Sequence, residues 1–187
     1  MDSLDWNKEL IPFAQAVEEV KLKMKGIRDE YLSMGLHSPI EIVMGRVKPI
    51  PSILQKAARK NIPKEEIFQR MKDIAGIRIM CQFVDDIYAV VNLIKQRPDL
   101  KVLGEKDYVQ HQKESGYRSY HLVIQYPFHS ISGPRNILME IQIRTLSMNF
   151  WATIEHSLNY KYGGEIPLHI QKRLKRSAEA AFLLDEE

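Results

Sequence analysis

Residues 137–144, ILMEIQIR, alternate apolar and polar side chains along the whole stretch. A period of two is typical of a β-strand that turns one face toward a core. The other face then carries Glu140, Gln142 and Arg144, together with Leu138. Burying charged groups without partners is costly, so this charged strip indicates a binding or catalytic surface.

The same period appears in neighbouring segments. Residues 74–83, IAGIRIMCQF, alternate with Arg78 on the polar face. Residues 118–126 predict another strand, joined to the strand at 137–144 through Pro127 and a Ser132-Gly133-Pro134 turn. Shorter strands are expected at residues 40–48 and 100–103. The sequence therefore predicts five strands.

Helical periodicity marks most of the remaining chain. Residues 6–33 predict one long amphipathic helix, in which Pro12 must lie in the first turn or mark a kink. The other expected helices open near Ser52, cover residues 64–71, run from an N-cap at Asp85 to Gln96, and cover residues 146–162 and 167–186. The polar segment 104–116 lacks any apolar period and is expected to be a mobile binding loop.

This order predicts an α+β fold, with a mixed five-stranded sheet flanked by helices. At 187 residues with 44% apolar content, the chain fits a single domain. Within it we expect an N-terminal helix (6–33), a catalytic core (40–162) and a C-terminal helix (167–186).

Composition excludes several classes of protein. The single cysteine, Cys81, cannot form an intramolecular disulfide or a cysteine-based zinc site. The first residues lack a signal-peptide pattern and no stretch is apolar enough to span a membrane, so a cytoplasmic location is expected. The net charge of +3 is only mildly basic. Because no glycine-rich phosphate loop of either familiar pattern occurs, side chains would have to hold any phosphate.

Basic residues gather around two of the predicted strands. Five cations are candidates for one cleft: Arg46, Lys48, Lys56, Arg59 and Arg78. Such a cluster is unfavourable unless an anion with several charges lies among it, and a triphosphate fits that need. The alternative is a set of ordinary surface cations.

Two carboxylates accompany these cations. Asp73 precedes one strand and Glu140 lies within another, so the two side chains could meet across a mixed sheet. Mg²⁺ is commonly held by one or two carboxylates together with substrate phosphate oxygens. Alternatively, Asp73 caps a helix and Glu140 pairs with Arg144.

Residues 113–121, KESGYRSYH, concentrate basic, hydroxyl and aromatic groups. Tyr117 could stack on a nucleobase, while Lys113 and His121 could contact phosphates. A structural tyrosine and a core histidine are the alternatives. In the helix at 146–162, Asn149 and Glu155 could line a cleft.

Five motifs together resemble the synthetase domain of the RelA/SpoT family. They are residues 45–48 (GRVK), 73–78 (DIAGIR), 115–121 (SGYRSYH), 140–145 (EIQIRT) and Glu155-His156. The resemblance covers residues 6–187 and is closest to stand-alone small alarmone synthetases of the RelQ type. It implies a nucleotidyltransferase-like synthetase domain that moves the β,γ-pyrophosphate of ATP to the 3′-hydroxyl of GTP or GDP.

The resemblance also implies roles for residues. For the donor, Arg46 and Arg78 would sandwich adenine, and the ATP phosphates would be held by Lys48, Lys56 and Arg59. Asp73 and Glu140 would bind Mg²⁺, and Glu140 would also accept the 3′-hydroxyl proton.

For the acceptor, Tyr117 would stack on guanine, and Lys113 and His121 would lie near the acceptor phosphates. Gln142 and Asn149 would line the acceptor side.

The resemblance further implies a homotetramer with a central cleft for pppGpp, where Lys21 and Lys25 match the family's lysines. Ile42 and Met44 replace Phe and Thr of the matching pattern, so weaker activation by pppGpp is expected. Some members of the family bind single-stranded RNA. Two rival hypotheses are a non-catalytic nucleotide- or single-stranded-RNA-binding module, and another nucleotidyltransferase that releases pyrophosphate.

Overall fold

The computed structural model describes residues 5–131 and 133–187. Its helices are α1 (Trp6–Ser33), α2 (Ile50–Arg59), α3 (Ile67–Arg70), α4 (Val84–Gln96), α5 (Leu146–Lys161) and α6 (Leu168–Glu186), with a 3-10 turn, η1 (Lys64–Glu66), before α3. Its strands are β1 (Ile42–Val47), β2 (Ala75–Cys81), β3 (Lys101–Asp107), β4 (Tyr120–Ser130) and β5 (Gly133–Thr145).

The five strands form one mixed sheet in the order β1-β2-β5-β4-β3. β2 and β5 are parallel, and the other neighbouring pairs are antiparallel. The register places Arg78 beside Gln142 and Gly76 beside Glu140, while His121 lies opposite Gln142 on the other side of β5. The predicted α+β fold with a mixed five-stranded sheet is confirmed.

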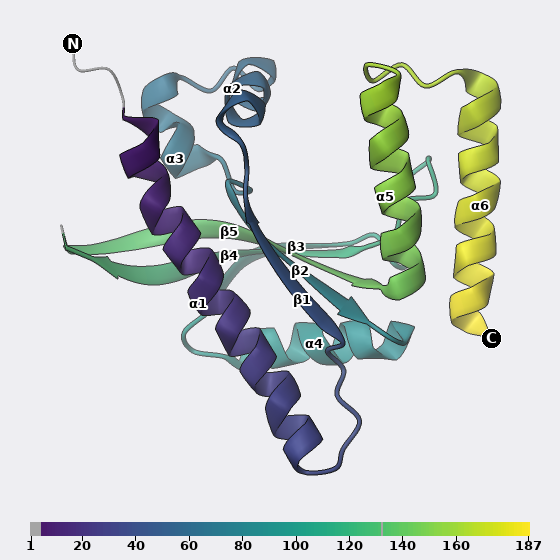
Figure 1. Ribbon diagram of the computed structural model, residues 1–187, viewed down its shortest axis with the longest axis horizontal. Coiled ribbons are helices and arrows are strands. Elements are labelled where there is room, and N and C mark those ends of the chain that lie inside the picture. Colours follow the sequence, from purple (N-terminus) through teal and green to yellow (C-terminus); the bar gives the residue numbers. More distant parts are fainter. Residues whose placement is uncertain (1–4, 132) are drawn as a thin grey trace.

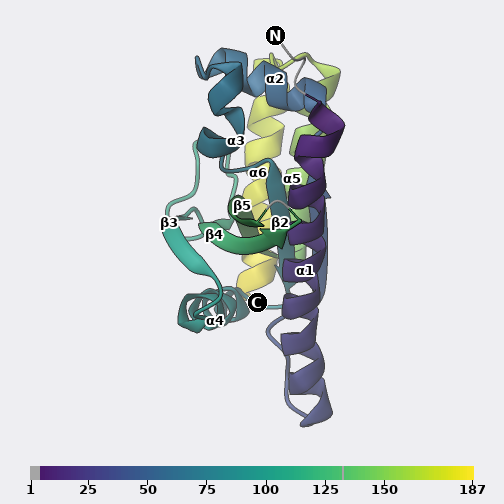
Figure 2. The same cartoon turned by 90° about the vertical axis from the view of Figure 1, so that its left-hand side faces the viewer.

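One face of this sheet is apolar and is covered by α1 and α4 (Figures 1 and 2). Its core contains Ile77, Ile79, Ile141 and Ile143 from the two central strands. Gly45 allows α1 to approach β1 closely, because a Cβ there would lie 2.4 Å from Cγ1 of Val17. The opposite face is therefore left to the charged strip.

Helices α5 and α6 form a hairpin beside the sheet (Figure 1). They pack around a second, smaller apolar cluster of Tyr117, Trp151, Ala152, Leu174 and Ala178. The indole Nε1 of Trp151 donates to the Leu174 carbonyl at 2.8 Å, which fixes the two helices to each other. In the described part of the chain, no helix is long and apolar enough to cross a membrane.

The segment 104–116 differs from its prediction as a loop, because residues up to Asp107 belong to β3. β3 is an edge strand that takes its backbone hydrogen bonds from β4, and its side chains are mostly exposed. The strand expected at residues 100–103 is the first part of β3, and its continuation to Asp107 was not predicted because a strand without a buried face carries no alternating apolar pattern. The connecting segment therefore begins only at Tyr108.

Three smaller expectations also change. Pro127 lies within β4 and Pro134 within β5, so the hairpin extends to Ser130 and Gly133; Ser132 lies outside the described residues. The N-cap of α4 is Phe83, whose backbone N–H donates to Asp86 at 3.2 Å, and Asp85 lies in the first turn. Pro12 is buried inside α1, beyond the first turn, and the helix continues through it.

Candidate functional site

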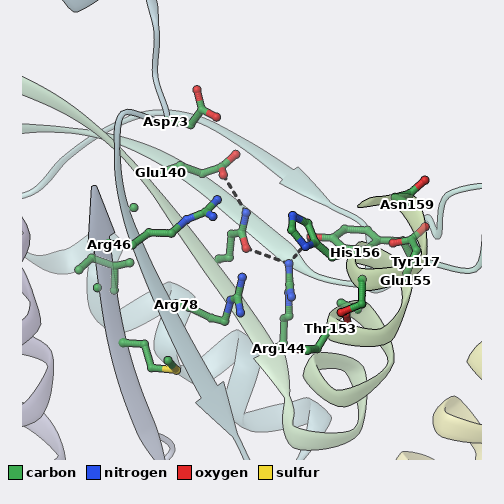
Figure 3. A pocket seen from close by; sticks show the side chains of 17 residues that line it. Arg46, Asp73, Arg78, Tyr117, Glu140, Arg144, Thr153, Glu155, His156 and Asn159 are labelled. Atoms are coloured by element: carbon green, nitrogen blue, oxygen red, sulfur yellow. Dashed lines mark hydrogen bonds between the residues drawn. The ribbon is translucent and has the colours of Figure 1, made fainter. Parts of the chain in front are cut away.

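The polar face of the sheet and one side of α5 enclose a cleft of about 430 Å³ (Figure 3). The strands and the residue two positions before β2 supply its charged and polar lining: Arg46, Asp73, Arg78, Glu140, Gln142 and Arg144. The opposite wall includes Thr153, Glu155, His156 and Asn159 of α5. These side chains share one face because the register aligns alternate residues of β1, β2 and β5.

Two lysines converge on Asp73 at one end of the cleft. The Nζ atoms of Lys48 and Lys56 lie 2.7 and 2.5 Å from Oδ2 of Asp73. Burial acts to raise the pKa of Asp73, but the hydrogen bonds and charges of the two lysines outweigh it and lower the pKa. Asp73 is thus an ionised carboxylate, and neither it nor the lysines caps a helix.

Three arginines from adjacent strands line the cleft without a carboxylate partner among the described residues: Arg46, Arg78 and Arg144. The Nε of Arg78 is buried and has no hydrogen-bond partner in the described part of the chain. Burial lowers the pKa of Arg78, and the charges of Arg144 and Arg46 lower it further. Repelling, desolvated cations of this kind favour an anionic or aromatic guest.

Glu140 lies at the centre of the cleft and is mostly buried. His121 Nδ1 lies 3.3 Å from its Oε1, and Gln142 Nε2 donates to its Oε2 at 2.8 Å. Burial raises the pKa of Glu140, but the hydrogen bond and charge of His121 and the Gln142 bond together lower it. The predicted alternative, a salt bridge from Glu140 to Arg144, is not formed.

Figure 3 shows the side chains of Asp73 and Glu140 next to each other in the cleft, and the charge of Asp73 acts to raise the pKa of Glu140. Within residues 5–131 and 133–187, no group of three or more His, Cys, Asp or Glu side chains is arranged to hold a metal. Two carboxylates suit Mg²⁺ if substrate oxygens complete its shell. The donor set therefore fits a metal that arrives with a nucleotide.

Tyr117 is only 8% exposed, and it contacts His121, the hydrogen-bond partner of Glu140. The Nζ of Lys113 lies 4.5 Å from the Tyr117 ring centre and 4.9 Å from that of Tyr108. The Tyr117 hydroxyl is hydrogen-bonded to His121 Nε2 at 2.8 Å. Lys113, Tyr117 and His121 are therefore brought together, as the sequence indicated, with the lysine over the ring.

Not every expected residue lines the cleft. Six are absent from its lining: Lys48, Lys56, Arg59, Lys113, His121 and Asn149. Four of these contact a residue that does line it, through Asp73 for Lys48 and Lys56 and through Tyr117 for Lys113 and His121. Arg59 is exposed on α2, and the buried Oδ1 of Asn149 is unpartnered among the described residues. Glu155 does line the cleft, as expected. Sequence reasoning assigned no role to Arg144, although the period of two already placed it on the same face as Glu140.

Comparisons with known proteins agree with this site. A family profile described as "Region found in RelA / SpoT proteins" matches residues 45–165. The chain is 59% identical over 187 residues to GTP pyrophosphokinase YjbM of Bacillus subtilis (strain 168), covering 100% of this chain and 88% of that protein. It is 42% identical over 184 residues to YwaC of the same organism, covering 97% and 88%.

Solved structures give the same result. The crystal structure of small alarmone synthetase 1 from Bacillus subtilis bound to its product pppGpp superposes with a TM-score of 0.95 at 59% identity, covering 98% of this chain and 94% of that one. The strand residues of the cleft described above lie inside the matched family region. The chain belongs to the RelA/SpoT family, among its small alarmone synthetases.

Proposed function

We propose that the cleft binds ATP and a guanosine nucleotide together and transfers the β,γ-pyrophosphate of ATP to the 3′-hydroxyl of GTP or GDP. The products are AMP with pppGpp or ppGpp. The 3′ oxygen forms a bond to the β-phosphorus of ATP, the bond from that phosphorus to the α,β-bridging oxygen breaks, and the hydroxyl proton passes to a base. The observation that carries this proposal is the juxtaposition of unpaired arginines and two carboxylates in one cleft.

The donor nucleotide is proposed to occupy the β1–β2 side. Arg46 and Arg78 would hold the adenine between their flat guanidinium groups, which stack well on aromatic rings. Lys48 and Lys56 would leave Asp73 for the ATP phosphates, and Arg59 would reach them from α2.

The acceptor is proposed to lie on the other side of Glu140. Tyr117 would stack on guanine, with Lys113 and His121 near the acceptor phosphates and Gln142 and Asn149 beside them. Glu140 would accept the 3′-hydroxyl proton. Such a transfer depends chiefly on alignment of the two nucleotides and on stabilisation of charge, because the protein forms no covalent bond to either.

Asp73 and Glu140 are proposed to hold Mg²⁺. When bound, the ion would neutralise phosphate charge and stabilise the charge that develops during transfer. Lys48 and Lys56 would then find their counter-charge on the phosphates, while Asp73 would find it on the ion. The ion pairs with Lys48 and Lys56 keep Asp73 ionised, as a metal ligand must be.

The test is incubation of the purified protein with ATP, GTP and Mg²⁺, followed by anion-exchange chromatography. We expect equal amounts of AMP and pppGpp, and a loss of about a hundredfold or more in Glu140→Gln, as when a group that stabilises a transition state is removed. Glu179→Gln, on the exposed side of α6, is the matched control and should keep the activity.

Other products would contradict the proposal. Nucleotide binding without any guanosine product would favour the binding-module hypothesis. Release of pyrophosphate in place of AMP would favour another nucleotidyltransferase.

The whole chain is proposed to act as one synthetase domain that assembles into a homotetramer in the cytoplasm, where its nucleotide substrates are found. Exposed apolar side chains on α1, the segment after it and β1 support assembly: Leu22, Leu32, Met34, Leu36, Ile42 and Met44. Size-exclusion chromatography with light scattering tests this. A monomer at micromolar concentration would contradict it.

Lys21 and Lys25 are proposed to bind pppGpp as an effector, and Lys21 would give up its ion pair with Glu18 to do so. Ile42 and Met44 are 41% and 52% exposed and offer neither an aromatic ring nor a hydroxyl to that ligand. Activation by pppGpp should therefore be weak; strong, saturable activation in a titration would contradict this.

Single-stranded RNA is proposed as a further partner on the mildly basic charge alone, and a gel-shift assay tests it.

A further inference from the structure

Five side chains in the cleft close a ring of hydrogen bonds. Arg144 Nη2 lies 2.5 Å from the Tyr117 hydroxyl, which lies 2.8 Å from His121 Nε2. His121 Nδ1 lies 3.3 Å from Glu140 Oε1. On the other side, Arg144 Nη2 lies 2.8 Å from Gln142 Oε1, and Gln142 Nε2 lies 2.8 Å from Glu140 Oε2. Figure 3 shows dashed lines leading from Glu140 through an intervening side chain to Arg144.

The chemistry of the two ends fixes the direction of the bonds that involve them. A guanidinium can only donate hydrogen bonds, and a carboxylate can only accept them. Arg144 therefore donates to the Tyr117 hydroxyl and to the Gln142 oxygen, and Glu140 accepts from His121 Nδ1 and from Gln142 Nε2. The bond between Tyr117 and His121 Nε2 takes its direction from whether Nε2 carries a proton. Both branches thus connect Arg144 with Glu140 and end on different carboxylate oxygens.

Arg144 has no acidic partner in the part of the chain that the structure describes, and it is only 4% exposed. Its remaining hydrogen bond goes from Nε to the Ser119 hydroxyl at 3.2 Å. A buried cation needs compensation, and hydrogen bonds aligned in one direction polarise one another. The carboxylate at the end of both branches supplies that compensation.

We propose that Arg144 is a positioning residue that, through these two branches, couples the binding of the acceptor base at Tyr117 to the orientation of Glu140. The proposal rests on the function proposed above and adds a role to it. A guanine stacked on Tyr117 fixes the ring, and the ring's hydroxyl fixes His121 and hence one oxygen of Glu140. These bonds hold Glu140 in the orientation in which it would face the 3′-hydroxyl of the bound acceptor.

Tyr117→Phe tests the longer branch, because it removes the hydroxyl and keeps the stacking ring. We expect kcat to fall about tenfold or more while KM for GTP changes less than about threefold, the pattern for an interaction that acts only on the chemical step. Tyr120→Phe is the matched control, since its hydroxyl bonds Glu105 at 2.7 Å, away from the ring of bonds. It should leave kcat unchanged.

A double-mutant cycle tests whether Arg144 acts through Tyr117. Arg144→Met should lower kcat more than Tyr117→Phe, and adding Tyr117→Phe to it should cost less than about threefold more, since coupled residues are not additive. Fully additive losses, or a Tyr117→Phe variant with normal kcat, would overturn the proposal. The Tyr117→Phe result stands even if Arg144→Met does not fold.

The wild-type assay separates this proposal from the function on which it rests. If the wild-type protein makes no pppGpp, the proposed function itself fails. If the wild type makes pppGpp and Tyr117→Phe raises KM for GTP without lowering kcat, only the coupling through Arg144 fails.

Discussion

Lys113 covers the aromatic face of Tyr117 on which guanine is proposed to stack, with its Nζ 4.5 Å from the ring centre. A bound nucleotide must therefore displace the ammonium, and a phosphate is the natural place for it to go. We expect Lys113→Ala to raise KM for GTP about tenfold, the effect of losing one charged hydrogen bond. KM for ATP should change little.

Steady-state kinetics with each nucleotide varied in turn measures this effect. Lys101→Ala, on the exposed edge strand β3, is the matched control and should change neither constant. An equal rise in both KM values would mean that Lys113 serves the fold of the cleft and not the acceptor.

For single residues, the sequence indicated which residue types form the site and which face of the sheet they lie on. The period of two along β5 placed Glu140, Gln142 and Arg144 on one side, and the structure confirms that. Two of the three partners of Arg144, Tyr117 and Ser119, could not be predicted, because they are neutral groups from the loop before β4; the third, Gln142, lies two residues away on β5. The roles assigned to individual residues stay predictions until variants are assayed.

Among the elements, the loop before β4 depends on its contact with α6. Gly116 has a φ of +92°, and a Cβ there would lie 2.6 Å from that of Ala178. Arg118 in the same loop places its guanidinium carbon 3.6 Å from the ring centre of Phe182. Because Tyr117 stands between these two contacts, α6 sets the position of the proposed stacking ring.

Gly116→Ala should therefore push the loop away from α6 and lower both stability and acceptor binding. The backbone conformation alone costs an L-residue about 1–2 kcal/mol, to which the clash adds. Thermal unfolding and KM for GTP measure the two effects, and KM for ATP should stay the same.

Gly163→Ala distinguishes the effect of backbone strain at a glycine from the effect of the contact between Gly116 and α6. Gly163 also has a positive φ, of +60°, but a Cβ there would meet no atom within 4 Å. This variant should lose some stability and keep its KM for GTP. A similar rise in KM for GTP in both variants would contradict a specific role for the contact with α6.

Periodicity predicted the elements with a buried face and gave only part of the strand that lacks one. The apolar stripes of α1 and α4 and the alternation in β2 and β5 all come from packing on one core. β3 has no such face, and its backbone pairing with β4 extends it through polar residues beyond the expected 100–103. The pairing of β4 with β5 carries these two strands through Pro127 and Pro134, positions that normally indicate a break.

For the whole molecule, the order of strands could not be read from alternation. A parallel pair, β2 with β5, lies between antiparallel pairs, and only that order places Gly76 beside Glu140 and Arg78 beside Gln142. Alternation fixed which residues share a face but not which strands are neighbours. The cleft is therefore a property of topology: the residues suggested that the cations share one cleft and that Asp73 and Glu140 meet, and the family resemblance supplied the arrangement.

The long helix α1 is attached to the rest of the molecule partly by charge. Lys23 of α1 and Arg97 each lie 2.8 Å from Oδ2 of Asp99, just after α4. The hydrogen bond from Arg97, reinforced by Lys23 against the cost of burial, lowers the pKa of Asp99 to about 2. Since the folded state favours the ionised carboxylate, this interaction stabilises the fold above the unfolded pKa of 3.8 and is lost as the pH falls toward 2.

Asp99→Asn should accordingly lower the free energy of unfolding at pH 7, by about 1 kcal/mol or less because the ion pairs are partly exposed. The difference from the wild type should narrow as the pH falls from 4 to 2 and vanish below that range, as followed by urea unfolding at a series of pH values. Glu179→Gln, an exposed change on α6, controls for a simple change of net charge. A difference that stays constant down to pH 2 would mean that Asp99 acts through neutral hydrogen bonds, and that charge does not hold α1 in place.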